Sequence, residues 1–193
     1  MRSISKMWLS ARRCALDLIE DRRGIAATEF AVIVPIMLVM FFGVVEFSSG
    51  VAVDRKVTLM ARTLSDLTSQ STSVASSDMT NFFAASNAIM TPYSPAPTRS
   101  TISELYIDPN TLVARVQWSK GSSPRAVSST VVVPSALAVA GTYLIYSEVS
   151  YLYTPAVGYV MSMSGVNLSD TSYTRPRQST CVFFSPATAC TTL

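Results

Sequence analysis

The sequence predicts an α+β protein with a long amino-terminal transmembrane helix, a short second helix and a small antiparallel β-sheet. Three observations indicate this class. An uncharged run of sixteen residues lies near the start, from Phe30 to Val45. Apolar residues then recur every three or four positions as far as Leu67, a spacing typical of a helix with one buried side. After Thr101 the period changes to two, which is typical of strands.

The uncharged run predicts a helix that spans a membrane. Sixteen residues fall short of the roughly 20 that cross the hydrocarbon core of a bilayer. Extending the segment back to Ile25 gives 21 residues and includes Glu29. Glu29 either marks the edge of the membrane or lies inside it, where a carboxylate is costly and is usually retained for a partner charge. We therefore expect a transmembrane helix over residues 25–50.

Basic residues are concentrated ahead of this helix, which predicts a cytoplasmic leader over residues 1–24. Six of the fifteen basic residues fall there: Arg2, Lys6, Arg12, Arg13, Arg22 and Arg23. The nine that follow Gly24 are balanced by nine acidic residues. No clustered basic face remains, so no nucleic-acid partner is predicted.

Two other interpretations of the amino-terminal segment compete with a cleaved leader. A secretory signal peptide has an apolar region of about 7 to 15 residues with a small-residue cleavage site after it. Here the apolar run is longer and continues into Glu46-Phe47-Ser48-Ser49-Gly50. An uncleaved single-span anchor fits the same residues and remains the principal alternative.

Residues 51–98 predict a helical extension, a linker and a second helix. The extension has apolar residues at helical spacing from Val53 to Leu67, and residues 69–77 are rich in Ser and Thr. Ser77 and Asp78 predict a cap and an acidic first turn for a helix that ends before Pro92.

Residues 99–193 predict an extracytoplasmic β-rich domain. The turn residues 108–111 separate two strand candidates, 102–107 and 112–118, and predict a hairpin. Further strand candidates are 129–133, 142–153 and a last strand within 173–184, with a loop over 158–169.

Three cysteines divide between the two sides of the predicted membrane. Cys14 lies in the leader, whereas Cys181 and Cys190 lie in the exported part with eight residues between them. In an oxidising compartment the latter two could close a small loop, or they could remain unpaired. We favour the bridge.

The sequence contains no histidine, which removes the commonest general base and metal ligand. A phosphate-binding glycine loop, a metal-ligand cluster and a serine-elbow motif are also missing from the sequence. An enzyme is therefore the weakest class, and no catalytic residue, metal site or cofactor is predicted.

The segment Arg22-Arg23-Gly24-Ile25-Ala26-Ala27-Thr28-Glu29-Phe30, followed by an apolar helix with Pro35, resembles the processing site of type IV-like pseudopilins, specifically the TadE-like family of Tad (Flp) pilus assembly proteins. Segments 61–70, 89–93 and 175–177 continue the resemblance. It implies a pilin-like fold, cleavage after Gly24 by a prepilin peptidase, Ile25 as the new terminus, and Glu29 with Phe30 as the fifth and sixth mature residues. The new amine on Ile25 then lies four residues from Glu29, so this carboxylate can neutralise the amine of its own chain or of a neighbour.

The predicted function is accordingly that of a minor pseudopilin in the assembly of an adhesion pilus. The resemblance implies four kinds of partner: the bacterial inner membrane, a prepilin peptidase, other pilins or pseudopilins, and Tad assembly proteins. It also implies a cytoplasmic amino terminus and a periplasmic carboxy-terminal domain that can enter the pilus. A minor subunit is expected because major Flp pilins are very short, whereas this chain carries a sizeable outer domain.

Overall fold

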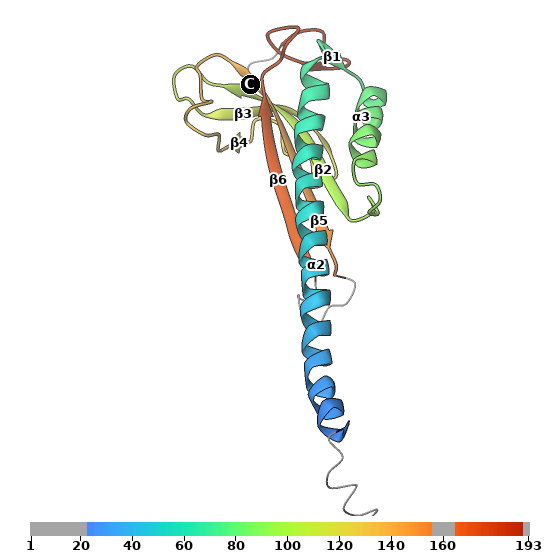
Figure 1. Ribbon diagram of the computed structural model, residues 1–193. Helices are drawn as coiled ribbons and strands as arrows, with labels where there is room; N and C mark the ends of the chain where they lie inside the picture. The colour runs from blue at the N-terminus through green and yellow to red at the C-terminus, as the bar shows by residue number, and fades with distance from the viewer. Residues whose placement is uncertain (1–22, 156–164, 191–193) are drawn as a thin grey trace, which may run out of the picture. The chain divides into compact units, whose positions relative to one another are not determined.

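The computed structural model describes residues 23–155 and 165–190 (Figure 1). The chain divides into two compact units at the junction of Val45 and Glu46, and each unit is treated separately below. Cys14, nearly all of the expected leader and part of the loop expected over 158–169 lie outside the described residues. Two helices are described: α2 (Arg23–Ser69) and α3 (Ser76–Ala88). The strands are β1 (Ser73–Val74), β2 (Thr98–Ile107), β3 (Ala114–Gly121), β4 (Thr130–Val131), β5 (Tyr143–Tyr153), β6 (Val166–Thr174) and β7 (Phe183–Phe184).

In the first unit, α2 exposes apolar side chains on every side. From Ile25 to Val45 its large apolar residues are almost all exposed, Phe30 by 69% and Leu38 by 49%. This stretch lies in the one described helix that is long and apolar enough to cross a membrane. Helices that are apolar all round need an apolar surrounding, which a bilayer provides.

In the second unit, α2 continues with one buried side. Val53, Val57, Met60 and Leu64 are fully buried, and their spacing of three and four places them on one face of the helix. This face packs against the sheet, where Ser147 Oγ of β5 donates a hydrogen bond to the carbonyl oxygen of Ala61 at 2.6 Å. The expected helical extension beyond residue 50 is therefore present.

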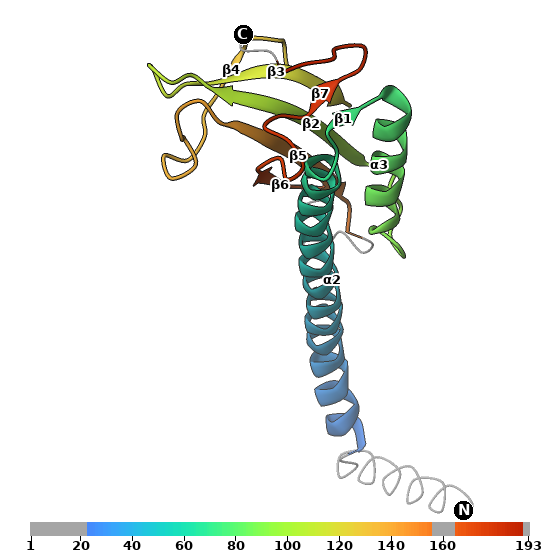
Figure 2. The same ribbon diagram turned by 90° about the horizontal axis from the view of Figure 1, so that it is seen from above.

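The sheet has five antiparallel strands in the order β4-β3-β2-β5-β6. One face of the sheet is covered by α3 and by the part of α2 from Glu46 to Ser69, which we call the outer part of α2 (Figure 2). There Ile102, Trp118 and Ile145 pack with residues of both helices. On the opposite face Leu105, Leu144 and their neighbours form a second cluster under the loop that follows β4. The predicted α+β class with a small antiparallel sheet is confirmed.

The predicted hairpin connects β2 and β3, although its second strand begins later than expected. Asp108 starts the turn, where its carboxylate accepts hydrogen bonds from the backbone N–H groups of Asn110 at 2.7 Å and Thr111 at 3.1 Å. The strand expected from Leu112 begins instead at Ala114, because Leu112 has a positive φ of 57° that a strand does not allow.

Three expectations about boundaries and strands are wrong. The helix expected to be capped by Ser77 begins at Ser76 with Ala75 as its cap residue, and the Asp78 carboxylate accepts the Ala75 N–H at 2.8 Å. Residues 173–184 do not form one last strand: β6 occupies 166–174, partly inside the expected loop, and only its last two residues fall in that range. Among the described residues after β6, only Phe183 and Phe184 form a strand, and they pair in parallel with β1 inside the expected linker. These errors arise because a polar edge strand and two-residue strands depend on their partners rather than on their own sequence.

Candidate processing and assembly site

The residues of the predicted cleavage motif lie in the first turns of α2. Gly24, Ile25, Glu29 and Phe30 are all exposed and helical, and Ile25 is 58% exposed. Thr28 Oγ1 donates a hydrogen bond to the carbonyl oxygen of Ile25 at 2.8 Å. In this chain the peptide bond after Gly24 therefore belongs to regular helix rather than to a loop.

Nothing in the packing or the backbone requires glycine at position 24. A Cβ atom built there meets no atom within 4 Å, and the residue does not adopt a positive φ. Glycine in a helix nevertheless destabilises it by roughly 1 kcal/mol relative to alanine. The reason for Gly24 must lie outside the stability of this helix.

Glu29 lies four positions after Ile25, which places the two on the same side of the helix. Among residues 23–155 and 165–190, the ion pairs are Arg125 with Glu148 and Arg177 with Asp66, so Glu29 is paired with no described cation. A carboxylate in an apolar segment that lacks a cation within the described chain is suited to a positive charge supplied by a new terminus or another molecule.

The second unit begins with a buried residue close to the end of the apolar stretch. Glu46 is 3% exposed, and its carbonyl oxygen accepts a hydrogen bond from Tyr153 Oη at 3.4 Å. The helix from Gly24 to Val45 rises by about 33 Å, close to the roughly 30 Å thickness of a hydrocarbon core. Its length therefore matches one membrane crossing.

Cys181 and Cys190 are joined by a disulfide in the structure, with Cα atoms 5.8 Å apart. They belong to residues 175–190, which we call the C-terminal strap. Arg177 attaches the start of this strap to α2, because its N–H donates to the Ser69 carbonyl at 2.9 Å and its guanidinium pairs with Asp66. The disulfide closes a loop at the other end of the same segment.

Glu104 fastens the middle of the strap and was not singled out from the sequence. It is 2% exposed and accepts the Val182 N–H at 2.6 Å, while Trp118 Nε1 donates to the Val182 carbonyl at 2.6 Å. Burial raises the pKa of Glu104 to about 7, although the hydrogen bond from Val182 acts in the opposite direction. Glu104 stands on the same strand face as Ile102, and a lone carboxylate on an apolar strand face is the signal that could have identified it.

The described residues contain no group of three or more His, Cys, Asp or Glu side chains that could hold a metal ion. The arrangement around Gly24 and Glu29 offers a recognition segment and a charge rather than a set of reacting groups.

Comparison with known proteins supports the same region. A family model described as TadE-like protein matches residues 24–64, which run from the predicted cleavage motif through the buried part of α2. No curated protein and no solved structure matches the chain. The match indicates a part in Tad pilus assembly, and TadE-like proteins are pilus components that are not known as enzymes. Residues 24–64 are thus a TadE-like segment, as the motif from Gly24 to Phe30 predicted.

Proposed function

We propose that this chain is a minor pseudopilin that acts in the assembly of a Tad (Flp) type adhesion pilus. The observation that carries the proposal is a TadE-like match beginning at Gly24, on a helix that exposes apolar side chains to Val45 and then continues into a packed domain. Residues 1–24 form a cytoplasmic leader, residues 25–50 cross the bacterial inner membrane, and residues 99–193 form the β-rich part of a periplasmic domain.

A prepilin peptidase removes the leader by cutting after Gly24. This role explains a glycine that neither packing nor backbone conformation requires. A residue without a side chain lets the scissile backbone approach a peptidase closely, and it lowers the cost of unwinding the helix at the cut. Cleavage leaves Ile25 as the new amino terminus.

Glu29 then acts in assembly by meeting the amine of Ile25 in its own chain or in a neighbouring subunit. Opposite charges in an apolar surrounding attract strongly, and each lowers the cost of placing the other in the membrane. The partners of the mature helix are accordingly other pilins or pseudopilins, and Phe30 adds apolar contact surface beside the charge.

The role of a minor subunit is supported by the size of the second unit. Residues 46–193 have their own clusters of buried side chains on both faces of a five-stranded sheet. A domain of this size is suited to starting or ending a fibre and presenting a surface, as expected for a chain larger than the short major pilins.

The decisive experiment replaces Glu29 by Gln in cells whose only copy carries the substitution. We expect normal membrane levels and removal of the leader, with Ile25 found by terminal sequencing, but a loss of pili counted by electron microscopy. Asp54→Asn serves as the matched control, because Asp54 is an exposed acid of the outer part of α2. An uncleaved anchor predicts the opposite pattern, with Met1 retained beside an active peptidase and normal piliation in the Glu29 variant.

A further inference from the structure

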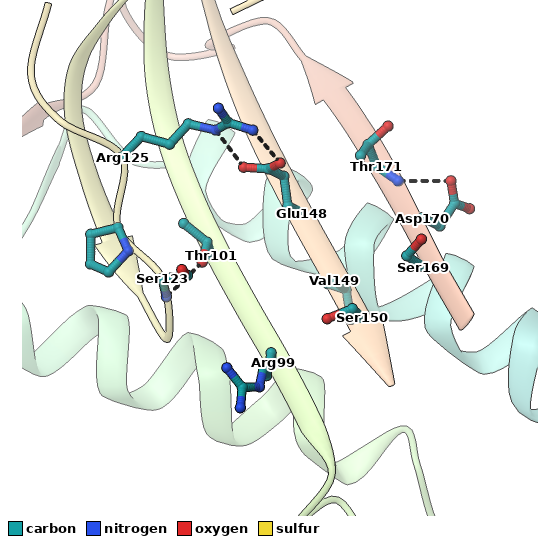
Figure 3. Close-up of a pocket in the computed structure, with 11 residues that line it drawn as sticks. Arg99, Thr101, Ser123, Arg125, Glu148, Val149, Ser150, Ser169, Asp170 and Thr171 are labelled. Atoms are coloured by element: carbon teal, nitrogen blue, oxygen red, sulfur yellow. Dashed lines mark hydrogen bonds and ion pairs between the residues drawn. The ribbon is translucent and has the colours of Figure 1, made fainter. Parts of the chain in front are cut away.

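A polar groove of about 590 Å³ lies on the sheet face that α2 and α3 leave uncovered (Figure 3). Thr101, Glu148 and Thr171 are register partners across β2, β5 and β6, so their side chains share one face. The neighbouring Ser147 points to the opposite face, where it bonds to Ala61 of α2. The groove is therefore separate from every residue to which the proposed function gives a role.

The floor of the groove consists of short hydroxyl side chains. Thr101 comes from β2, Ser150 from β5, and Ser169 and Thr171 from β6. On the outer face of a sheet, long charged side chains usually cover the strands. Short residues here leave a hollow across three strands and supply hydroxyls that can both donate and accept hydrogen bonds.

One wall is the loop after β3, which several contacts hold in place above β2. Gly121, the last residue of β3, leads into this loop with a φ of 138°. A Cβ there would lie 2.2 Å from the Ser100 carbonyl oxygen, so only glycine permits this close approach. The Ser123 N–H then donates to Thr101 Oγ1 at 3.2 Å, and the Arg125 N–H donates to Ser119 Oγ at 3.0 Å. The groove is thus preformed, as ligand sites usually are.

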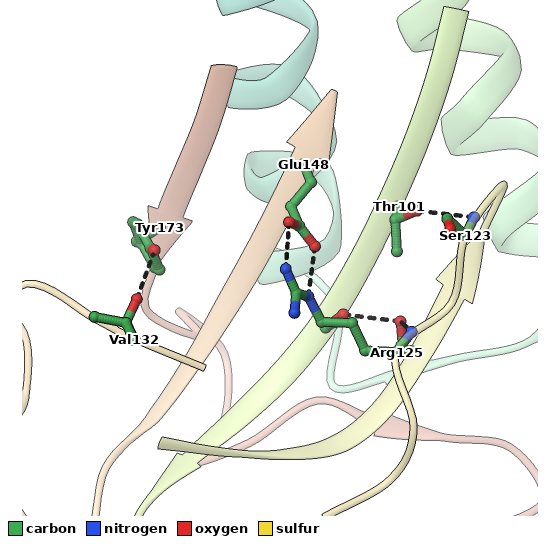
Figure 4. A network of polar contacts seen from close by, with 8 residues as sticks. Thr101, Ser123, Arg125, Val132, Glu148 and Tyr173 are labelled. Carbon is green, nitrogen blue, oxygen red and sulfur yellow. Dashed lines mark hydrogen bonds and ion pairs between the residues drawn. The ribbon is translucent and has the colours of Figure 1, made fainter. Parts of the chain in front are cut away.

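The Arg125 guanidinium binds the Glu148 carboxylate through two hydrogen bonds of 2.7 and 2.6 Å (Figure 4). Burial raises the pKa of Glu148, but the hydrogen bonds from Arg125 and Tyr146, together with the charge of Arg125, outweigh it and hold this pKa below its ordinary value. Both groups are therefore charged and neutralise each other. The pair fixes one end of the groove without giving it a net charge.

Arg99 supplies the net positive charge at the other end. It is exposed and forms no ion pair with any residue that the structure describes. Asp170 is the register partner of Val149, so its side chain belongs to the face opposite Thr171, and its carboxylate accepts the Thr171 N–H at 2.7 Å. The groove face therefore combines the Arg99 guanidinium with hydroxyls that both donate and accept hydrogen bonds.

This combination favours one class of ligand. A sugar chain presents hydroxyls that donate to and accept from the serines and threonines, and a carboxylate on a sugar ring matches Arg99. A purely acidic peptide would bring several carboxylates to a groove in which Arg99 is the one described lining cation without an ion pair.

We propose that the groove over β2, β5 and β6 binds a carboxylated oligosaccharide, with Arg99 holding the carboxylate and the hydroxyl floor holding the ring hydroxyls. The volume suits a ligand of a few sugar rings, within the range of about 300 to 1,000 Å³ found for ligand sites. Binding at this surface does not depend on cleavage after Gly24 or on the role of Glu29.

The test is calorimetric titration of the full chain in detergent micelles with trigalacturonic acid. We expect saturable binding, with affinity reduced about tenfold or more by Arg99→Gln, because one charge-assisted hydrogen-bonded contact is lost. Ser169→Tyr, which places a ring in the groove from an exposed position, should give a similar loss. Arg62→Gln removes the same charge from an exposed position on α2 and should leave the affinity unchanged.

Two further probes show which group of the ligand the groove recognises. Neutral maltotriose should bind at least about tenfold more weakly than the acidic sugar, because it lacks the group that Arg99 holds. Absence of saturable binding, equal binding of maltotriose, or an equal loss in the Arg62 variant would overturn the proposal. Stronger binding of hexaglutamate than of the sugar would overturn it in favour of an acidic peptide.

Discussion

The two parts of α2 place similar residues in different surroundings. Between Gly24 and Val45 large apolar side chains are exposed on every side. Between Glu46 and Ser69 most of them face the protein core, and the charged residues other than the buried Glu46 are exposed or half-buried. Helix formation is common to both parts, so it does not distinguish them. The distribution of charged residues around the helix does distinguish the two parts. A bilayer excludes charged residues from every side of a helix, whereas a protein core excludes them only from the side that packs against it.

The same Leu→Ala substitution, made once in each part of α2, measures this difference. The loss of stability expected in the outer part is the largest of the effects predicted below. Leu64→Ala removes a fully buried side chain from the core beside Ile102 and Val182, so we expect a loss of about 2 to 5 kcal/mol in the free energy of unfolding. Leu38→Ala in the apolar part should change it by less than about 1 kcal/mol. Urea unfolding in detergent, followed by Trp118 fluorescence in a Trp8→Phe background, gives both values. Equal losses would mean that the two parts share one packed interior.

Two carboxylates sharpen the comparison, since Glu104 lies in a protein core and Glu29 in the apolar part of α2. The folded-state pKa of Glu104 is about 7, above its ordinary 4.5, so the folded protein binds this proton more tightly than the unfolded chain. The resulting stability is full below pH 4.5 and is lost as the pH rises through 7, by up to about 3 kcal/mol. Glu104→Gln keeps an acceptor for Val182 and should remove this part of the pH dependence. Unfolding midpoints at pH 5 and pH 8 test it, and an unchanged slope in the Glu104 variant would contradict it.

The strap provides a comparison within the second unit. Closing the loop between Cys181 and Cys190 should stabilise the domain by roughly 2 to 3 kcal/mol, because it restricts the unfolded chain. Non-reducing peptide mapping of exported protein should show the two cysteine peptides linked. The double substitution to Ser should lower the free energy of unfolding by the stated amount. Two freely alkylated thiols would show that the strap is held by its hydrogen bonds alone.

Neighbouring basic residues on the outer part of α2 give the smallest expected effect. Lys56 Nζ donates to the carbonyl oxygens of Ile89 and Thr91, both at 2.8 Å, whereas Arg55 is exposed and has no ion pair among the described residues. Lys56→Met should cost about 1 to 2 kcal/mol, since two acceptors lose a charged donor. Arg55→Met should cost less than about 0.5 kcal/mol. The same unfolding assay compares them, and indistinguishable midpoints would contradict the assigned contacts.

The sequence was sufficient to predict those features whose pattern of residues is local and extends over several turns of chain. The uncharged run and the spacing of Val53, Val57 and Leu64 predicted α2, and the turn chemistry of Asp108 predicted the hairpin. The motif around Gly24 was sufficient to identify the TadE-like segment. Each of these signals is contained within a few turns of chain and does not depend on distant residues.

Other features depended on distant partners and could not be predicted. Strand β6 is polar and follows Gly165, yet it pairs along its length with β5, and Ser65 of α2 bonds to Ser172 and Thr174. The roles of Glu104 and Val182 arise from a contact across 78 positions of the sequence. No local period encodes such a contact, because it exists only when the sheet and the strap are both in place.

The buried face of α2 is covered mainly by residues that follow it much later in the chain. Ser65 meets β6 across 107 positions, and Leu64 packs beside Val182 of the strap. If the chain crosses the membrane from its amino terminus, this apolar face emerges long before the strands that cover it. Contacts between such distant positions form slowly, and exposed apolar surface promotes aggregation in the meantime. On that route the second unit remains open to aggregation until the strap has emerged, and a chaperone that shields α2 would act within that period.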